Sequence, residues 1–218
     1  GLTRNPLSNN ELWLKSVLPA RELQTTPAAA YQGLLTDTAM YLTMYDVLLQ
    51  RAIERLPQND NQAIIDSLYQ QWIKFRKTDT AHPRALLMVT LDYLSFYQRA
   101  KNTDADNTYY IHSLDSLQRE YAAKDFVVEV LHRHAEYYQG VAGQARNDGT
   151  IATTIATTGT TGTTVETPLA IAHKICVDGI AKYPDYERIG LLKNLLADLT
   201  NPQAGIAADN VVYPGHDL

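Results

Sequence analysis

The chain has 218 residues, of which 45% are hydrophobic and 20% charged, a composition typical of an ordinary globular protein. Its 19 Lys and Arg against 24 Asp and Glu give a net charge of −5, and without a basic stripe this balance argues against a nucleic-acid-binding protein. No apolar run approaches the roughly 20 residues of a membrane-spanning helix, and the first residues show no signal-peptide pattern, although a chain that begins with Gly1 is compatible with earlier removal of a leader.

The first part of the chain predicts amphipathic helices separated by short turns. Helical segments are expected over residues 8–18 and, more briefly, 27–35. The strongest helical pattern covers residues 38–56 and is expected to open at Thr36 or Asp37, because its apolar residues recur every three or four positions.

Three pairs of helices are predicted to follow this segment. Pro83 suits the first turn of its helix, and Asp125 can cap another. The tail from residue 200 is rich in Pro and Gly and is expected to be extended. The predicted pairs are 63–77 with 83–100, 108–123 with 125–142, and 168–184 with 185–199.

A Thr/Gly-rich insertion at residues 149–167 separates the second of these pairs from the third. Thr and Ile favour extended backbone, Gly favours disorder, and the absence of charge from Gly149 to Val165 favours neither solubility nor a packed helix. The sequence therefore predicts either a flexible loop or a protruding hairpin at this place.

Repeated helix–turn–helix units predict an all-α fold. We expect antiparallel helix pairs stacked as an irregular TPR-like (tetratricopeptide-like) superhelix, forming a single domain over residues 1–218. Aromatic residues mark the repeat, because Phe75, Tyr121 and Tyr183 each close the first helix of a pair at similar intervals once the insertion is subtracted.

Two histidines are candidate metal ligands. On a helix, His132 and His134 point roughly 200° apart and are not expected to share an ion. His132 and Glu136 are better spaced but lack a third ligand. The pattern favours surface or packing histidines over a metal site.

Two pairs of acids and a single cysteine are the other candidates for chemistry. Asp104 with Asp106, and Asp185 with Glu187, lie just before or at the start of predicted helices, where the helix dipole favours negative charge, so capping is expected rather than a glycosidase pair. Cys176 lies in an apolar helical pattern and predicts a small buried residue rather than a reactive thiol.

No motif of a known catalytic or cofactor site occurs in the chain. A nucleophile elbow, a P-loop, a dinucleotide fingerprint and a zincin helix are all missing, and Gly159 and Gly162 lack the Lys or helix start of a phosphate cradle. The sequence predicts no catalytic, cofactor-binding or metal-binding residues, and hence no enzyme and no cofactor. Trp13 and Trp72 are expected either to pack in the core or to stack on a sugar.

Residues 39–56, 64–96 and 168–202 resemble the helical N-terminal region of large bacterial alpha-2-macroglobulin-like proteins. The "tyrosine-aspartate, leucine, arginine-alanine" helix of that family and its "tyrosine-proline" and "leucine, proline" ends are matched by Tyr45, Asp46, Leu48, Arg51, Ala52, Tyr183, Pro184, Leu199 and Pro202. The resemblance implies a module of a much longer exported protein, periplasmic or on the cell surface, whose later domains carry a bait region and sometimes a thioester. Cys176 is followed by Val-Asp-Gly and not by the thioester context of the family.

We therefore expect a non-enzymatic helical interaction or scaffold module of an alpha-2-macroglobulin-like protein, in the protease-inhibitor or cell-envelope-defence class. Its partners would be other domains of the same long chain or a separate protein. The alternative is a TPR-like surface lipoprotein that binds glycan for carbohydrate uptake, with Trp72 and nearby tyrosines stacking on the sugar. An enzyme would require His132, His134 or Asp185 to converge with a further polar group.

Overall fold

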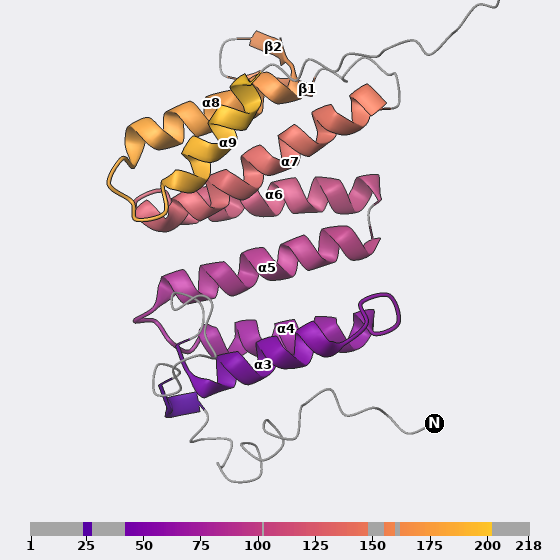
Figure 1. Ribbon diagram of the computed structural model, residues 1–218, viewed down its shortest axis with the longest axis vertical. Helices are drawn as coiled ribbons and strands as arrows, with labels where there is room; N and C mark the ends of the chain where they lie inside the picture. Colours follow the sequence, from indigo (N-terminus) through magenta and orange to yellow (C-terminus); the bar gives the residue numbers. More distant parts are fainter. Residues whose placement is uncertain (1–23, 28–41, 102, 148–154, 160–161, 202–218) are drawn as a thin grey trace, which may run out of the picture. The chain divides into compact units, whose positions relative to one another are not determined.

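A computed structural model describes residues 24–27, 42–101, 103–147, 155–159 and 162–201 (Figure 1). These residues form helices and one two-stranded hairpin, so the predicted helical class is confirmed for the part described. The elements are α3 (Met44–Arg55), α4 (Gln62–Arg76), α5 (Pro83–Lys101), α6 (Asp104–Glu120), a 3-10 turn (Asp125–Val127), α7 (Val128–Asn147), β1 (Ile155–Gly159), β2 (Gly162–Glu166), α8 (Pro168–Lys182) and α9 (Gly190–Thr200). The helices predicted over 8–18 and 27–35 and the tail beyond residue 201 lie outside the described residues.

Tertiary contacts divide the chain into two compact units, Gly1–His134 and Ala135–Leu218. The boundary between them falls inside α7. This division does not test whether the helices form one continuous repeat domain over residues 1–218, which stays a prediction.

In the first unit, consecutive helices pack against each other in antiparallel order, α3 on α4, α4 on α5 and α5 on α6 (Figure 1). Their apolar residues recur at helical spacing, so each helix buries one face. Every large side chain buried in this way contributes roughly 1.5–3 kcal/mol to folding. One core cluster joins α3, α4 and α5 through Val47, Leu49, Ile53, Ile65, Tyr69, Trp72, Val89 and Phe96.

The expected start of the first described helix is corrected by the structure. Thr43 is extended, with φ −128° and ψ 163°, and is the N-cap of α3. Its backbone N–H donates to Asp46 Oδ2 at 2.7 Å, and Met44 N donates to Thr26 O at 3.0 Å. The helical pattern over 38–56 therefore does not continue through Thr43. The cap at Thr43 makes α3 begin at Met44, later than periodicity suggests.

The starts of the next helices either agree with the predicted positions or differ from them because of local capping. α5 begins at Pro83, as predicted. α6 begins at Asp104, before the predicted residue 108, because the Thr103 side chain caps it by accepting from Asp106 N at 3.3 Å. Asp125 opens a 3-10 turn rather than capping α7 directly, and its Oδ1 accepts from Phe126 N at 2.8 Å.

The second unit contains a helix pair and the hairpin. The Thr167 side chain caps α8 by accepting from Ala170 N at 3.2 Å, and Pro168 occupies the first turn. α8 packs against α9. α9 begins at Gly190 and not at residue 185, because two turns, closed by Tyr186 N to Tyr183 O and Ile189 N to Tyr186 O, precede it.

The insertion contains the antiparallel hairpin. Its register pairs Ile155 with Glu166 and Gly159 with Gly162. Of the two structures that the sequence left open for residues 149–167, the described residues therefore adopt the hairpin.

The three aromatic landmarks lie where the repeat predicted them. Phe75 is the last residue but one of α4, while Tyr121 and Tyr183 are the C-caps of α6 and α8. All three therefore lie at helix ends, as predicted, whereas the pairing of α6 with α7 and the TPR-like superhelix stay predictions.

Candidate functional site

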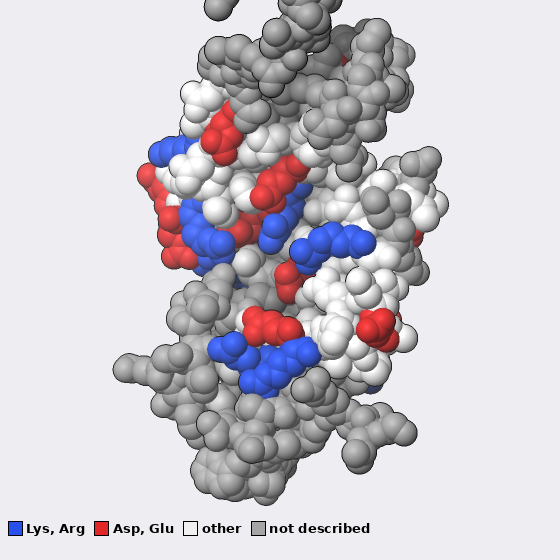
Figure 2. Space-filling view, turned by 45° about the vertical axis from the view of Figure 1, so that its right-hand side comes forward, with Lys and Arg blue, Asp and Glu red and all other residues white. Residues whose placement is uncertain are grey.

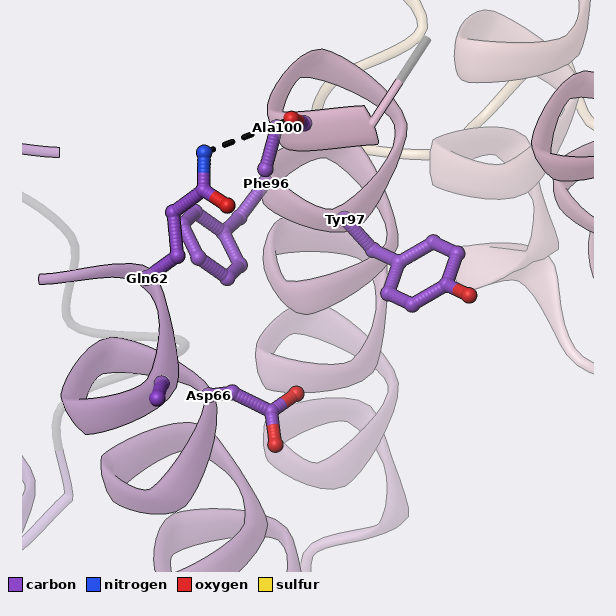
Figure 3. A pocket seen from close by; sticks show the side chains of 6 residues that line it. Gln62, Asp66, Phe96, Tyr97 and Ala100 are labelled. Atoms are coloured by element: carbon purple, nitrogen blue, oxygen red, sulfur yellow. Dashed lines mark hydrogen bonds between the residues drawn. The ribbon is translucent and has the colours of Figure 1, made fainter. Parts of the chain in front are cut away.

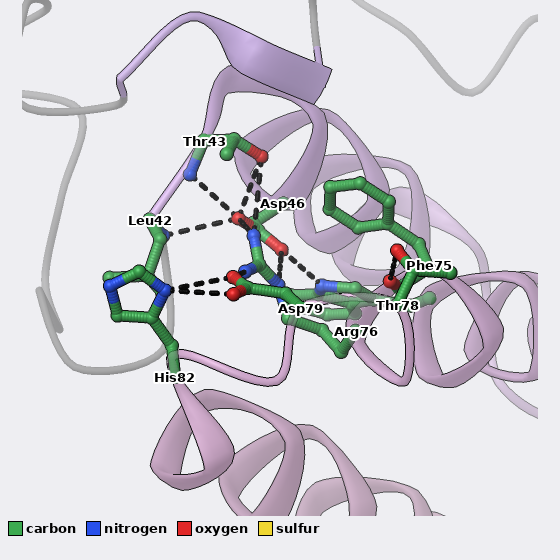
Figure 4. Close-up of polar contacts among 9 residues, drawn as sticks. Leu42, Thr43, Asp46, Phe75, Arg76, Thr78, Asp79 and His82 are labelled. Atoms are coloured by element: carbon green, nitrogen blue, oxygen red, sulfur yellow. Dashed lines mark hydrogen bonds and ion pairs between the residues drawn. The ribbon is translucent and has the colours of Figure 1, made fainter.

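The carboxylate of Asp46 lies at the centre of a group of polar contacts (Figure 4). Its Oδ1 accepts from Trp72 Nε1 and from Arg76 Nε, both at 2.7 Å. Its Oδ2 accepts from Leu42 N at 3.1 Å, from Thr43 N at 2.7 Å, from Thr43 Oγ1 at 2.9 Å and from Arg76 Nη2. Every lone pair of this buried carboxylate is therefore engaged within the protein.

The network continues from Arg76 toward the surface. Arg76 Nη1 donates to Asp79 Oδ2 at 2.8 Å, and Asp79 also lies 2.9 Å from Nδ1 of the exposed His82 (Figure 4). We call Asp46, Arg76, Asp79 and His82 the polar network. It joins α3, α4 and the turn before α5, and the Arg76 guanidinium lies between the carboxylates of Asp46 and Asp79, so the network serves to position these helices.

The histidines singled out in the sequence lie on α7. His134 is buried, and its Nδ1 lies 3.4 Å from Gln118 Oε1 while its Nε2 lies 3.8 Å from Asp115 of α6. Burial lowers the pKa of His134, and the Asp115 carboxylate opposes that shift. Within the described residues, no three His, Cys, Asp or Glu side chains gather in a way that would hold a metal ion.

The paired acids are placed differently from one another. Asp104 and Asp106 occupy the first turn of α6, as the dipole argument predicted. Asp185 and Glu187 are exposed and lie in the turns just before α9, which begins at Gly190.

Cys176 and Trp72 are both fully buried. Burial raises the pKa of the Cys176 thiol to about 11, and the prediction of a small core residue is confirmed. Trp72 packs in the core with its N–H bonded to Asp46, so it is not available to stack on a sugar. Trp13 lies outside the described residues.

A pocket of about 520 Å³ opens between α4 and α5 (Figure 3). Gln62 Nε2 donates to Ala100 O at 3.3 Å beside it, and the half-buried Asp66 lies on its α4 side. We call this the α4–α5 pocket, and its lining residues are Gln62, Ala63, Asp66, Phe96, Tyr97 and Ala100.

A row of aromatic rings leads away from the α4–α5 pocket. Tyr93 OH donates to Asp66 Oδ1 at 2.8 Å. The ring of Tyr97 lies 6.2 Å from Tyr93 and 5.4 Å from Tyr109 of α6, which is 51% exposed. Burial, reinforced by the hydrogen bond to Asp66, raises the pKa of Tyr93 to about 12. We call Tyr93, Tyr97 and Tyr109 the tyrosine row.

No recognised motif marks the residues of the α4–α5 pocket in the sequence. One available signal was the spacing of Tyr93 and Tyr97, which places two tyrosines on one face of α5. The pairing with Asp66 depends on how α4 packs against α5, which periodicity does not specify.

The surface charges give a further constraint on partners. On the face shown in Figure 2, acidic and basic side chains are interspersed, and no continuous basic stripe crosses its described residues. None of the described helices combines the length and apolar character needed to cross a membrane.

No protein-family model, no curated protein and no solved structure matches this chain.

Proposed function

We propose that this chain is a non-catalytic helical interaction module, built as a TPR-like stack, that binds other domains of a longer protein or a separate protein partner. One observation carries the proposal: the α4–α5 pocket and the tyrosine row expose aromatic and apolar side chains of three consecutive helices beside one another. Stacked helices commonly use such composite surfaces for protein binding.

The chemistry of this surface suits a protein interface. Tyrosine is enriched at interfaces because its ring buries apolar area while its hydroxyl retains a hydrogen bond. Tyr109 is 51% exposed, so a partner that covers it would remove a large side chain from water.

The polar network supports a scaffold rather than a catalyst. A catalytic carboxylate must be able to reach substrate, whereas the Asp46 carboxylate is buried and saturated with donors. Its evident use is to fix α3 against α4 and so to hold the binding surface in one shape.

The class of the longer protein rests on the resemblance to alpha-2-macroglobulin-like proteins. The matching residue Asp46 has a structural use here, since it is the centre of the polar network that joins α3 to α4. On this proposal the protein belongs to the periplasm or cell surface of a bacterium, in the protease-inhibitor or envelope-defence class. Sequencing the complete reading frame tests it, because a following series of β-sandwich domains is expected.

Photo-cross-linking tests the binding function. A photoreactive amino acid is placed at Ala63, which is exposed and lines the α4–α5 pocket, or at Tyr109 in the protein expressed in its native cells. The exposed Val177 of α8 is the matched control. We expect the first two positions to cross-link to the same protein or to the same domain of a longer chain, and Val177 to give a different pattern. If Ala63 and Tyr109 yield no protein adduct, the proposed function is wrong.

Glycan binding is the second candidate, and it is favoured by the exposed ring of Tyr109. Aromatic faces stack on sugar rings, but the buried Trp72 cannot contribute. A glycan array probed with the protein and with Tyr109→Ala tests this candidate. Binding that is lost in the variant would support it, and an array without signal would remove it.

A further inference from the structure

The α4–α5 pocket carries one charge that its own lining does not neutralise. Among the described lining residues only Asp66 has a carboxylate or a basic side chain. Asp66 Oδ1 accepts from Tyr93 OH, and Oδ2 accepts no hydrogen bond from any residue that the structure describes. The carboxylate lies on α4 beside the pocket, as Figure 3 shows.

The other lining residues of the pocket suit the hydrocarbon part of a long side chain. Phe96 is almost fully buried, and Ala63 and Ala100 add small apolar surfaces. Tyr97 contributes an aromatic ring on the α5 side (Figure 3). A carboxylate next to apolar and aromatic walls matches a side chain with a hydrocarbon stem and a cationic end.

We infer that the α4–α5 pocket binds a lysine or arginine side chain presented by a protein partner. The cationic group pairs with Asp66 Oδ2, the stem packs on Phe96 and the small apolar residues, and the residues flanking it contact the tyrosine row. This inference rests on the proposed function and names the chemistry of the partner.

The charge of the pocket distinguishes this occupant from a sugar. A neutral sugar would hydrogen-bond to Asp66 but would leave its charge uncompensated, whereas a cation neutralises it and gains a charge-assisted hydrogen bond. An anionic partner is disfavoured for the same reason.

The test uses the full chain and a library of short random peptides displayed on phage. Peptides retained by the wild-type protein are sequenced, synthesised with a fluorophore, and measured by fluorescence anisotropy. The variant Asp66→Asn keeps an oxygen for Tyr93 OH while removing the charge. The matched control is Asp92→Asn, because Asp92 also accepts a tyrosine hydrogen bond, from Tyr69 at 2.7 Å, but does not line the pocket. Circular dichroism and thermal melting verify that both variants are folded.

We expect the selected peptides to contain Lys or Arg next to an apolar residue. Asp66→Asn should weaken their binding up to about five-fold, the upper end of the range for an exposed charge pair, while Asp92→Asn should leave it nearly unchanged. Replacing the basic residue of the peptide by norleucine should have an effect similar to Asp66→Asn, and the effects of the two changes should not add.

Three results would overturn the inference. They are a wild-type protein that selects no peptide, selected peptides without basic residues, and binding that Asp66→Asn does not weaken. A glycan-array signal that depends on Tyr97 but not on Asp66 would likewise assign the pocket to sugar. The cross-linking at Ala63 and Tyr109 is independent of the charge in the pocket, so it still reports whether the chain binds a protein when the inference fails.

Discussion

Arg76 of α4 and Asp46 of α3, 30 residues apart in the sequence, form an ion pair in which both side chains are fully buried. Removing two charges from water is costly, and such a pair is tolerated when further hydrogen bonds satisfy its remaining atoms. Here Trp72, Thr43 and Asp79 supply them. The pair therefore couples the two helices strongly even where its net contribution to stability is modest.

Asp46→Asn is expected to destabilise the protein by about 3–5 kcal/mol, because the Arg76 charge would stay buried without its counterion. Urea denaturation followed by circular dichroism measures the change. The control is Glu54→Gln, which breaks the exposed Arg51–Glu54 pair of 3.1 Å and should cost less than about 1 kcal/mol. Equal effects of the two substitutions would contradict a special role for Asp46.

The double variant Asp46→Leu with Arg76→Met should be more stable than the sum of its single variants predicts. Each single change leaves one buried charge unpaired, whereas the double change removes both. A double-mutant cycle from the same denaturation curves gives the coupling free energy. Strict additivity would show that the two charges do not interact in solution.

Thr43→Ala should cost about 1 kcal/mol, because the N-cap hydroxyl that donates to Asp46 is lost. Thr90→Ala is the matched control. The Thr90 hydroxyl donates to Leu86 O within α5, and alanine at a helix interior position costs little or stabilises. We expect Thr43→Ala to lower the free energy of unfolding clearly more than Thr90→Ala. A larger loss from Thr90→Ala would argue against the cap.

The start of α3 and the α4–α5 pocket mark the limit of what the sequence alone could predict. Periodicity found α5 and the burial of Cys176, because both follow from the apolar pattern of one helix. It missed the true start of α3, where the capping pair of Thr43 and Asp46 competes with an apolar pattern that runs past it. It also missed Asp66 as a site residue, because its neighbourhood is created by α4 packing on α5.

The free energy of unfolding should fall as the pH is lowered, and part of this fall should depend on His134. Burial lowers the pKa of His134 in the folded protein, and Asp115 opposes this shift. The stability contributed by neutral His134 is therefore present above the unfolded pKa of 6.5 and lost as pH falls through the lower folded pKa. In urea denaturation from about pH 8 to about pH 5, His134→Gln should lose less stability than the wild type. If the free energies of unfolding of the wild type and of His134→Gln change equally with pH, protonation of His134 does not contribute to the loss of stability.

The thiol of Cys176 should react slowly with an aromatic disulfide reagent in the native protein. The side chain is fully buried, and its pKa of about 11 keeps the thiol protonated at mildly alkaline pH. Released chromophore measures the rate, and the urea-unfolded chain is the control, with a rate close to that of free cysteine. Native reaction at the rate of the unfolded chain would show that the α8–α9 pair opens readily.

The order of helix packing also constrains how the first unit can assemble during synthesis. Each helix from α3 to α5 packs on the helix that follows it in the chain. When α3 leaves the ribosome, the Asp46 carboxylate still lacks the indole and guanidinium donors that only α4 brings. An unpaired carboxylate favours water over an apolar interior. The smallest part of this unit that can bury the Asp46 carboxylate is thus the pair of α3 and α4. We therefore expect α3 to reach its packed position only after α4 has been synthesised.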